Sequence, residues 1–251
     1  MAQCEQLTTA VGPMVSARGR MRELDSALPP RDGVAIFNRV YLTVAEAVAA
    51  KPTGGGFPQV RATIVLVERL AARYLGAVGT MDAGHVPPAA WRPLLRLRRH
   101  AGVRPAQFAL AAINAHVGHD LTLAVVDACR TLDCEPADME DDFDRVGDLL
   151  TVLEERVHDE LVPGPEVLRV TDPLAHLLDA WRLDRARETA WASARALWSL
   201  DRRPEVARDF AARLDAGVGL ATRLLLTPLP DGLDGAHSRP RVGQALGAHR
   251  A

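Results

Sequence analysis

The sequence has almost no lysine: of its 30 basic residues only Lys51 is a lysine, and the others are arginines. The arginines are spread along the chain beside abundant alanine, which favours a coding bias over a phosphate-binding surface. The formal net charge of −2 also provides no general attraction for nucleic acid or an anionic membrane. We therefore expect neither a nucleic-acid partner nor a membrane partner.

Cysteines and long apolar runs are also scarce. Cys4, Cys129 and Cys134 are too few for a disulfide framework, and Cys129 and Cys134 alone cannot complete a zinc knuckle. The first residues lack the basic and apolar stretches of a secretory signal. No run of about 18 apolar residues is free of polar interruption, so we expect no membrane-spanning helix. These absences predict a cytoplasmic protein with reduced thiols.

The remaining composition is that of a globular chain, with 48% hydrophobic and 25% charged residues over 251 positions. Apolar residues recur at steps of three and four, the spacing of one helix face. The predicted helices cover residues 32–50, 60–78, a short stretch around 91–95, 105–129, about 136–161, a segment from 172 and a segment from 204. No segment shows sustained period-two alternation, so strands are few or absent.

This pattern predicts an all-α fold: a single domain of about seven or eight helices packed around a central buried helix at about 105–130. Residues 1–30 are predicted to be an N-terminal extension, 31–228 the all-α domain and 229–251 a disordered or loosely held tail.

Polar residues interrupt the most apolar of these helices. At about 100° per residue, His116, His119, Asp120 and Asp127 share one stripe of the central helix, whereas Asn114 points roughly the other way. Burying such groups costs several kcal/mol, on the order of 2–7 for a polar group, unless they are paired or bind something. The cluster therefore needs a physical explanation.

Three explanations compete. First, His116, His119 and Asp120 could ligate Zn, Fe or Mn, since imidazole and carboxylate suit these metals. Such a site needs a ligand from another helix, and the candidates are Glu68, Asp144 and His158. Second, Asp120 could orient an imidazole for general acid/base work. Third, the groups could form a closed structural network that sets the helix register.

Several segments resemble a known family. Residues 33–41 (GVAIFNRVY), 107–110 (QFAL) and 114–121 (NAHVGHDL) are similar to a family of bacterial, mostly actinobacterial, proteins known only as a domain of unknown function. Ala186-Arg187 and Ala190-Trp191 fit the same pattern, and Ala112 and Gly118 depart from it. The resemblance spans about residues 33–226 and implies one domain. It supports a functional role for six residues but implies no activity. These residues are Asn38, His116, His119, Asp120, Arg187 and Trp191.

Two further groups carry weaker signals. The acidic run at 140–144 superficially resembles the Mg²⁺-binding motif of class I terpene synthases, but its spacing differs, and acids in a first helical turn suit the helix dipole without a ligand. Arg187 lies near the tryptophan stripe and would need a carboxylate partner, for which Asp120 and Asp144 are candidates. The other arginines are interpreted as solvated, including the strip Arg92, Arg96, Arg98 and Arg99.

The leading hypothesis is a small-molecule enzyme with an apolar, tryptophan-bordered pocket beside the central helix. His116, His119 and Asp120 would be catalytic, in metal-assisted chemistry with a divalent metal as cofactor or in acid/base chemistry without a cofactor. The residues predicted to bind a hydrophobic or acidic small molecule are Asn38, Tyr41, Arg187 and Trp191. The alternatives are an isoprenoid-type cyclase using Mg²⁺ at 140–144, and a non-catalytic helical binding or scaffold protein. The scaffold alternative predicts His and Asp groups hydrogen-bonded to one another with no adjoining cavity.

Overall fold

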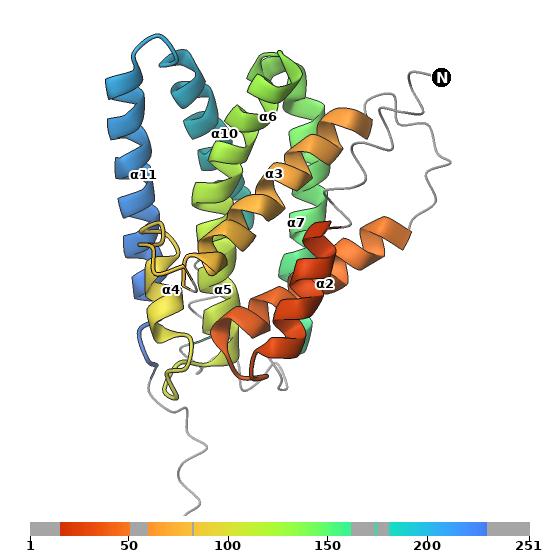
Figure 1. Cartoon of the computed structure of the whole chain (residues 1–251), viewed down its shortest axis with the longest axis vertical. Coiled ribbons are helices and arrows are strands. Elements are labelled where there is room, and N and C mark those ends of the chain that lie inside the picture. The colour runs from red at the N-terminus through yellow and green to blue at the C-terminus, as the bar shows by residue number, and fades with distance from the viewer. Residues whose placement is uncertain (1–15, 51–59, 82, 162–173, 175–180, 230–251) are drawn as a thin grey trace, which may run out of the picture.

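The computed structural model describes residues 16–50, 60–81, 83–161, 174 and 181–229. In these ranges every regular element is a helix and no strand occurs, which confirms the predicted all-α fold (Figure 1). The helices are α2 (Gly33–Ala50), α3 (Val60–Gly79), α4 (Arg92–Leu97), α5 (Pro105–Ala115), α6 (Thr122–Leu132), α7 (Glu140–Leu161), α10 (Leu183–Ser199) and α11 (Pro204–Leu225). A π-helical segment, η1 (His116–Leu121), joins α5 to α6, and a 3₁₀ turn, η2 (Pro136–Met139), precedes α7.

The predicted central helix is a continuous rod made of α5, η1 and α6. Helices α2, α7 and α11 pack on α5, and α3 and α10 pack on α6. In Figure 1, α10 and α11 lie on one side of the rod and α2 and α7 on the other, with α3 crossing it. The side chains that surround the rod come from all of these helices and form the main hydrophobic cluster, while a small second cluster contains Ala106 and Leu174.

The rod, Pro105–Leu132, is 28 residues long, and by length and mean hydropathy it could cross a membrane. In this fold, 83% of its most apolar window is buried by the neighbouring helices. A core helix covered on most sides has no need of a polar face, which accounts for its composition. The cytoplasmic location remains a prediction.

The start of α2 is held by a buried ion pair. Asp32 caps the helix as predicted, because its Oδ1 accepts the Val34 backbone N–H at 3.0 Å. The same carboxylate binds Arg98 Nε, with 2.6 Å between Nε and Oδ2, and both side chains are almost fully buried. The interpretation of Arg98 as part of a solvated strip was therefore wrong. Gly33 is required next to this pair, since a Cβ there would overlap the Phe108 ring.

The predicted N-terminal extension contains packed structure. Residues 16–27 form a helix whose Met21 is buried in the main core. The backbone oxygen of Met21 accepts a 2.8 Å hydrogen bond from Asn38 Nδ2 on α2. The packed unit thus begins no later than residue 16. Residues 1–15 and 230–251, the latter comprising nearly all of the predicted tail, lie outside the described residues.

The other helix boundaries follow the sequence with one exception. Pro105 and Pro204 begin α5 and α11 as expected, and the segment predicted from about 136 begins with the 3₁₀ turn η2 and continues as α7. The helix predicted from residue 172 differs: Trp181 and Arg182 are not helical, and α10 starts at Leu183. Most of the stretch from 162 to 180 lies outside the described residues.

The buried Asp32–Arg98 pair supports a stability prediction. Asp32→Asn keeps an N-cap residue but leaves the Arg98 guanidinium buried without its counter-charge, so urea unfolding should show a loss of about 3–5 kcal/mol. The matched control is Glu46→Gln, which removes the exposed Arg22–Glu46 pair and should cost no more than about 1 kcal/mol. Equal losses for the two variants would contradict the assigned role of Asp32.

Candidate functional site

The three predicted catalytic residues all lie on η1, the only π-helical turn among the described residues. A π turn bonds each N–H to the carbonyl five residues back and occurs frequently at functional sites. The spacing of about 100° per residue therefore fails across 116–121. Asp127 does not join the cluster, since its carboxylate pairs with Arg73 of α3. Asn114 lies against α11, where its Nδ2 donates to Val218 O and Thr222 Oγ1.

Asp120 is the centre of the cluster. Its buried carboxylate faces three nitrogen atoms: Trp91 Nε1 at 2.9 Å, His119 Nδ1 at 2.8 Å and His116 Nδ1 at 3.3 Å. Burial by itself would raise the pKa of Asp120, but the hydrogen bonds and the charges of the two histidines outweigh it and lower the pKa. Asp120 is therefore ionised at neutral pH, and a carboxylate can only accept hydrogen bonds.

His119 connects Asp120 to a second carboxylate. Its Nε2 lies 3.6 Å from Asp215 Oδ1 on α11, within ion-pair range. Asp215 in turn accepts the backbone N–H groups of Ala89 and Ala90, each at 2.8 Å. Gly219, one turn further along α11, allows close approach, since a Cβ there would overlap the Ala89 carbonyl. The segment carrying Trp91 is thus attached to α11 beside the cluster.

His116 occupies the interior of an aromatic cage. The imidazole is fully buried, and its ring centroid lies 5.0–6.3 Å from those of Phe37, Tyr41, Tyr74 and Trp91. Because ionised Asp120 accepts from His116 Nδ1, that nitrogen carries a proton. His116 Nε2 has no hydrogen-bond partner in the structure. A buried, unpaired polar atom of this kind calls for an explanation.

Asn38 and Tyr41, predicted to bind substrate, lie near this cage in different settings. Asn38 is fully buried, and its amide is already engaged, because Oδ1 accepts the Tyr74 hydroxyl at 3.1 Å and Nδ2 donates to Met21. Tyr41 packs edge-on against His116, at 5.0 Å between ring centroids. Burial, followed by the negative charge of Asp120, raises the pKa of the Tyr41 hydroxyl, so the phenol stays neutral.

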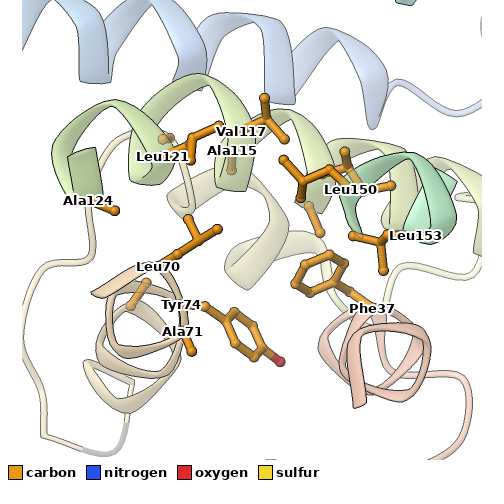
Figure 2. Packing of buried hydrophobic residues seen from close by; sticks show 14 of the residues in the cluster. Phe37, Leu70, Ala71, Tyr74, Ala115, Val117, Leu121, Ala124, Leu150 and Leu153 are labelled. Atoms are coloured by element: carbon orange, nitrogen blue, oxygen red, sulfur yellow. The ribbon is translucent and has the colours of Figure 1, made fainter. Parts of the chain in front are cut away.

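Tyr41 also borders an apolar cavity of about 50 Å³ between α2, α3 and α7. The other lining residues are Val44, Ala45, Val67, Leu70, Val146, Leu149, Leu150 and Leu153. Figure 2 shows Leu70, Leu150 and Leu153 directed from α3 and α7 toward the space shared with Phe37 and Tyr74. None of the described residues that line it carries a charged side chain.

Arg187 and Trp191 belong to a separate contact between α10 and α7. Arg187 pairs with Asp144 at 3.5 Å, one of its two predicted partners, and its guanidinium lies over the Phe143 ring and the bare backbone of Gly147. Trp191 packs on the same ring, with 4.6 Å between centroids. None of these contacts involves the η1 cluster.

The further metal ligands proposed from the sequence lie on other helices, Glu68 on α3 and Asp144 and His158 on α7. Among the described residues, no group of three or more His, Cys, Asp or Glu side chains is placed to hold a metal ion. Asp144 pairs with Arg187. Within the acidic run, Asp142 is buried against Thr63 and Arg145, whereas Asp141 and Asp144 are exposed. Metal binding remains a prediction.

Sequence reasoning missed two members of the site, Trp91 and Asp215. The indole N–H of a fully buried tryptophan needs an acceptor, so Trp91 was a recognisable candidate. Asp215 gave less signal, because an acid on an amphipathic helix is ordinarily solvated.

A family model matches residues 16–228 and describes a family of unknown function, DUF5995. The chain belongs to this family. The match confirms the resemblance inferred from the sequence and extends it to the helix at 16–27; bacterial origin remains a prediction. No curated protein and no solved structure matches the chain. Within DUF5995, function must therefore be argued from the site itself.

The lowered pKa of Asp120 predicts how stability depends on pH. A carboxyl whose pKa in the folded state is below its ordinary value of 3.8 stabilises the fold above about pH 4, and this contribution is lost as pH falls through the lowered pKa. Asp120→Asn should cost about 3–5 kcal/mol of unfolding free energy at pH 7, and the difference from wild type should shrink below pH 4.

Asp209→Asn is the matched control, since Asp209 forms an exposed pair with Arg213 one helical turn away. It should cost no more than about 0.5 kcal/mol at pH 7. A difference between Asp120→Asn and wild type that stays constant from pH 7 to pH 3 would contradict the ionised state assigned to Asp120.

Proposed function

We propose that this DUF5995 protein is a small-molecule enzyme in which His116 transfers a proton to and from an apolar ligand, with Asp120 as its positioning partner. The observation that carries the proposal is the His116 Nε2 atom, which is buried, without a hydrogen-bond partner and surrounded by aromatic rings. An unprotonated ring nitrogen is the form of histidine that acts as a general base.

Asp120 supplies the orientation that such a base needs. A carboxylate at Nδ1 holds the imidazole in one tautomer and stabilises the imidazolium that forms when Nε2 takes a proton. Trp91 and His119 complete the hydrogen bonding of this carboxylate, so it stays in place without solvent. His119 lies between Asp120 and Asp215, so a positive charge that forms on the two histidines would face two carboxylates.

The surroundings of His116 favour a neutral apolar ligand. The cage consists of aromatic rings, and the lining of the adjoining cavity is uncharged over the part of the chain that the structure describes. Arg187, which could have anchored an acidic substrate, is engaged with Asp144 and Phe143 on α7. The scaffold alternative shares the mutual His–Asp hydrogen bonds but predicts no adjoining cavity, so the cavity beside Tyr41 favours the enzyme.

A small neutral electrophile tests whether Nε2 of His116 is basic and reachable. Iodoethane is attacked by an imidazole lone pair, which forms the N–C bond as iodide leaves. In the native full-length chain, mass spectrometry of peptides should find ethylation of His116 at a rate well above that of global unfolding. Asp120→Asn should slow this reaction at least tenfold, because the tautomer is no longer held.

His119 in the same protein is the internal control, since carboxylates face both of its nitrogens and should keep its modification at least tenfold slower. Modification of His116 only as fast as the chain unfolds would overturn the proposal in favour of a closed structural network. Stoichiometric Zn, Fe or Mn bound through His116 in the purified protein would overturn it in favour of metal ligation.

A further inference from the structure

We infer that the cavity between α2, α3 and α7 is the binding site for a short alkyl segment of the ligand, with Tyr41 as the contact between that segment and His116. This inference rests on the proposed function and adds the substrate class: a neutral molecule with an unbranched alkyl group. The cavity and the cage are separate observations, and Tyr41 belongs to both.

The lining of the cavity determines the chemistry of the occupant. Apart from Tyr41, the lining side chains are aliphatic, with Val44 and Ala45 from α2, Val67 and Leu70 from α3, and four more from α7. A charged or strongly polar group placed there would lose its hydration without a compensating partner. Diphosphates and carboxylates are therefore disfavoured, whereas a methylene chain gains from leaving water.

The size of the cavity limits the length of the segment. A space of about 50 Å³ is several times the 10–15 Å³ that one water molecule needs on this measure, and about one third of the roughly 150 Å³ apolar cavity that accepts benzene. It suits a chain of a few carbons rather than a ring system. Its apolar walls give water few partners, so an alkyl group does not have to displace well-bound water.

Tyr41 determines where the part of the ligand outside the cavity lies. Tyr41 lies on α2 one turn after Phe37, and both rings contact His116. Because the Tyr41 ring borders the cavity and also packs against His116, a ligand whose alkyl end fills the cavity would have its next atoms against the Tyr41 ring. Tyr41 is thereby a specificity-determining residue that separates the alkyl subsite from the base.

A homologous series of n-alkanols from ethanol to hexanol tests the inference on the full-length chain. Binding is followed by NMR through the methyl groups of Leu70, Leu150 and Leu153. Affinity should rise about fourfold with each added methylene and level off once the cavity is full. Bound butanol should also protect His116 from ethylation by iodoethane, because the two occupy adjoining space.

Filling the cavity should abolish this binding. Ala45→Leu and Val67→Phe replace half-buried lining residues on two different helices, and each should weaken butanol binding at least tenfold. Val152→Leu is the matched control on α7, since Val152 is exposed and outside the lining, and it should leave binding unchanged.

The outcomes separate this inference from the proposed function. Ethylation of His116 without saturable alkanol binding, or binding that survives both filling variants, overturns the alkyl subsite and leaves the base in place. Alkanol binding at the lining methyl groups without any native ethylation of His116 overturns the proposed function and, with it, the link through Tyr41.

Discussion

Three nitrogen donors converge on the buried carboxylate of Asp120, and the site is organised around that convergence. A carboxylate removed from water is costly, and it is retained only where hydrogen bonds replace its hydration. Trp91 comes from the segment before α4, and the two histidines come from η1 itself. The requirement to satisfy one charge therefore ties an irregular segment to the middle of the central rod.

The π-helical turn η1 lets both histidines reach the Asp120 carboxylate. In an α-helix, neighbouring residues point about 100° apart, which would separate the adjacent side chains of His119 and Asp120. Within η1 their side chains meet, with 2.8 Å between Nδ1 and Oδ1, while His116 still reaches the other oxygen. On the far side of His119, Asp215 connects the same network to α11 and to the backbone of residues 89 and 90.

The features that the sequence predicted are those that local patterns encode. Apolar periodicity located the core helices, and Asp32, Pro105 and Pro204 marked helix starts that the structure confirms. The cluster of His116, His119 and Asp120 was visible because polar residues are conspicuous in an apolar helix. The need of the Arg187 guanidinium for a carboxylate was also visible, with Asp120 and Asp144 as candidates, and the structure pairs it with Asp144.

The features that could not be predicted depend on contacts between distant segments. Arg98 is buried because it forms an ion pair with Asp32, which lies 66 residues earlier in the chain. The local sequence around α4 gives no sign of this pairing. Asp215 joins the cluster only through the packing of α11 on the rod. Asp127 was expected on the same stripe of the central helix, and its carboxylate pairs with Arg73 of α3 across the contact between α3 and α6.

The protonation of His116 tests the account most directly. In the uniformly ¹⁵N-labelled full-length chain at pH 7, the imidazole ¹⁵N signals of His116 should report a protonated Nδ1 and an unprotonated Nε2, and Asp120→Asn should remove this preference. A wild-type His116 with its proton on Nε2, or with both nitrogens protonated, would contradict the claim that Asp120 holds a buried base facing the aromatic cage.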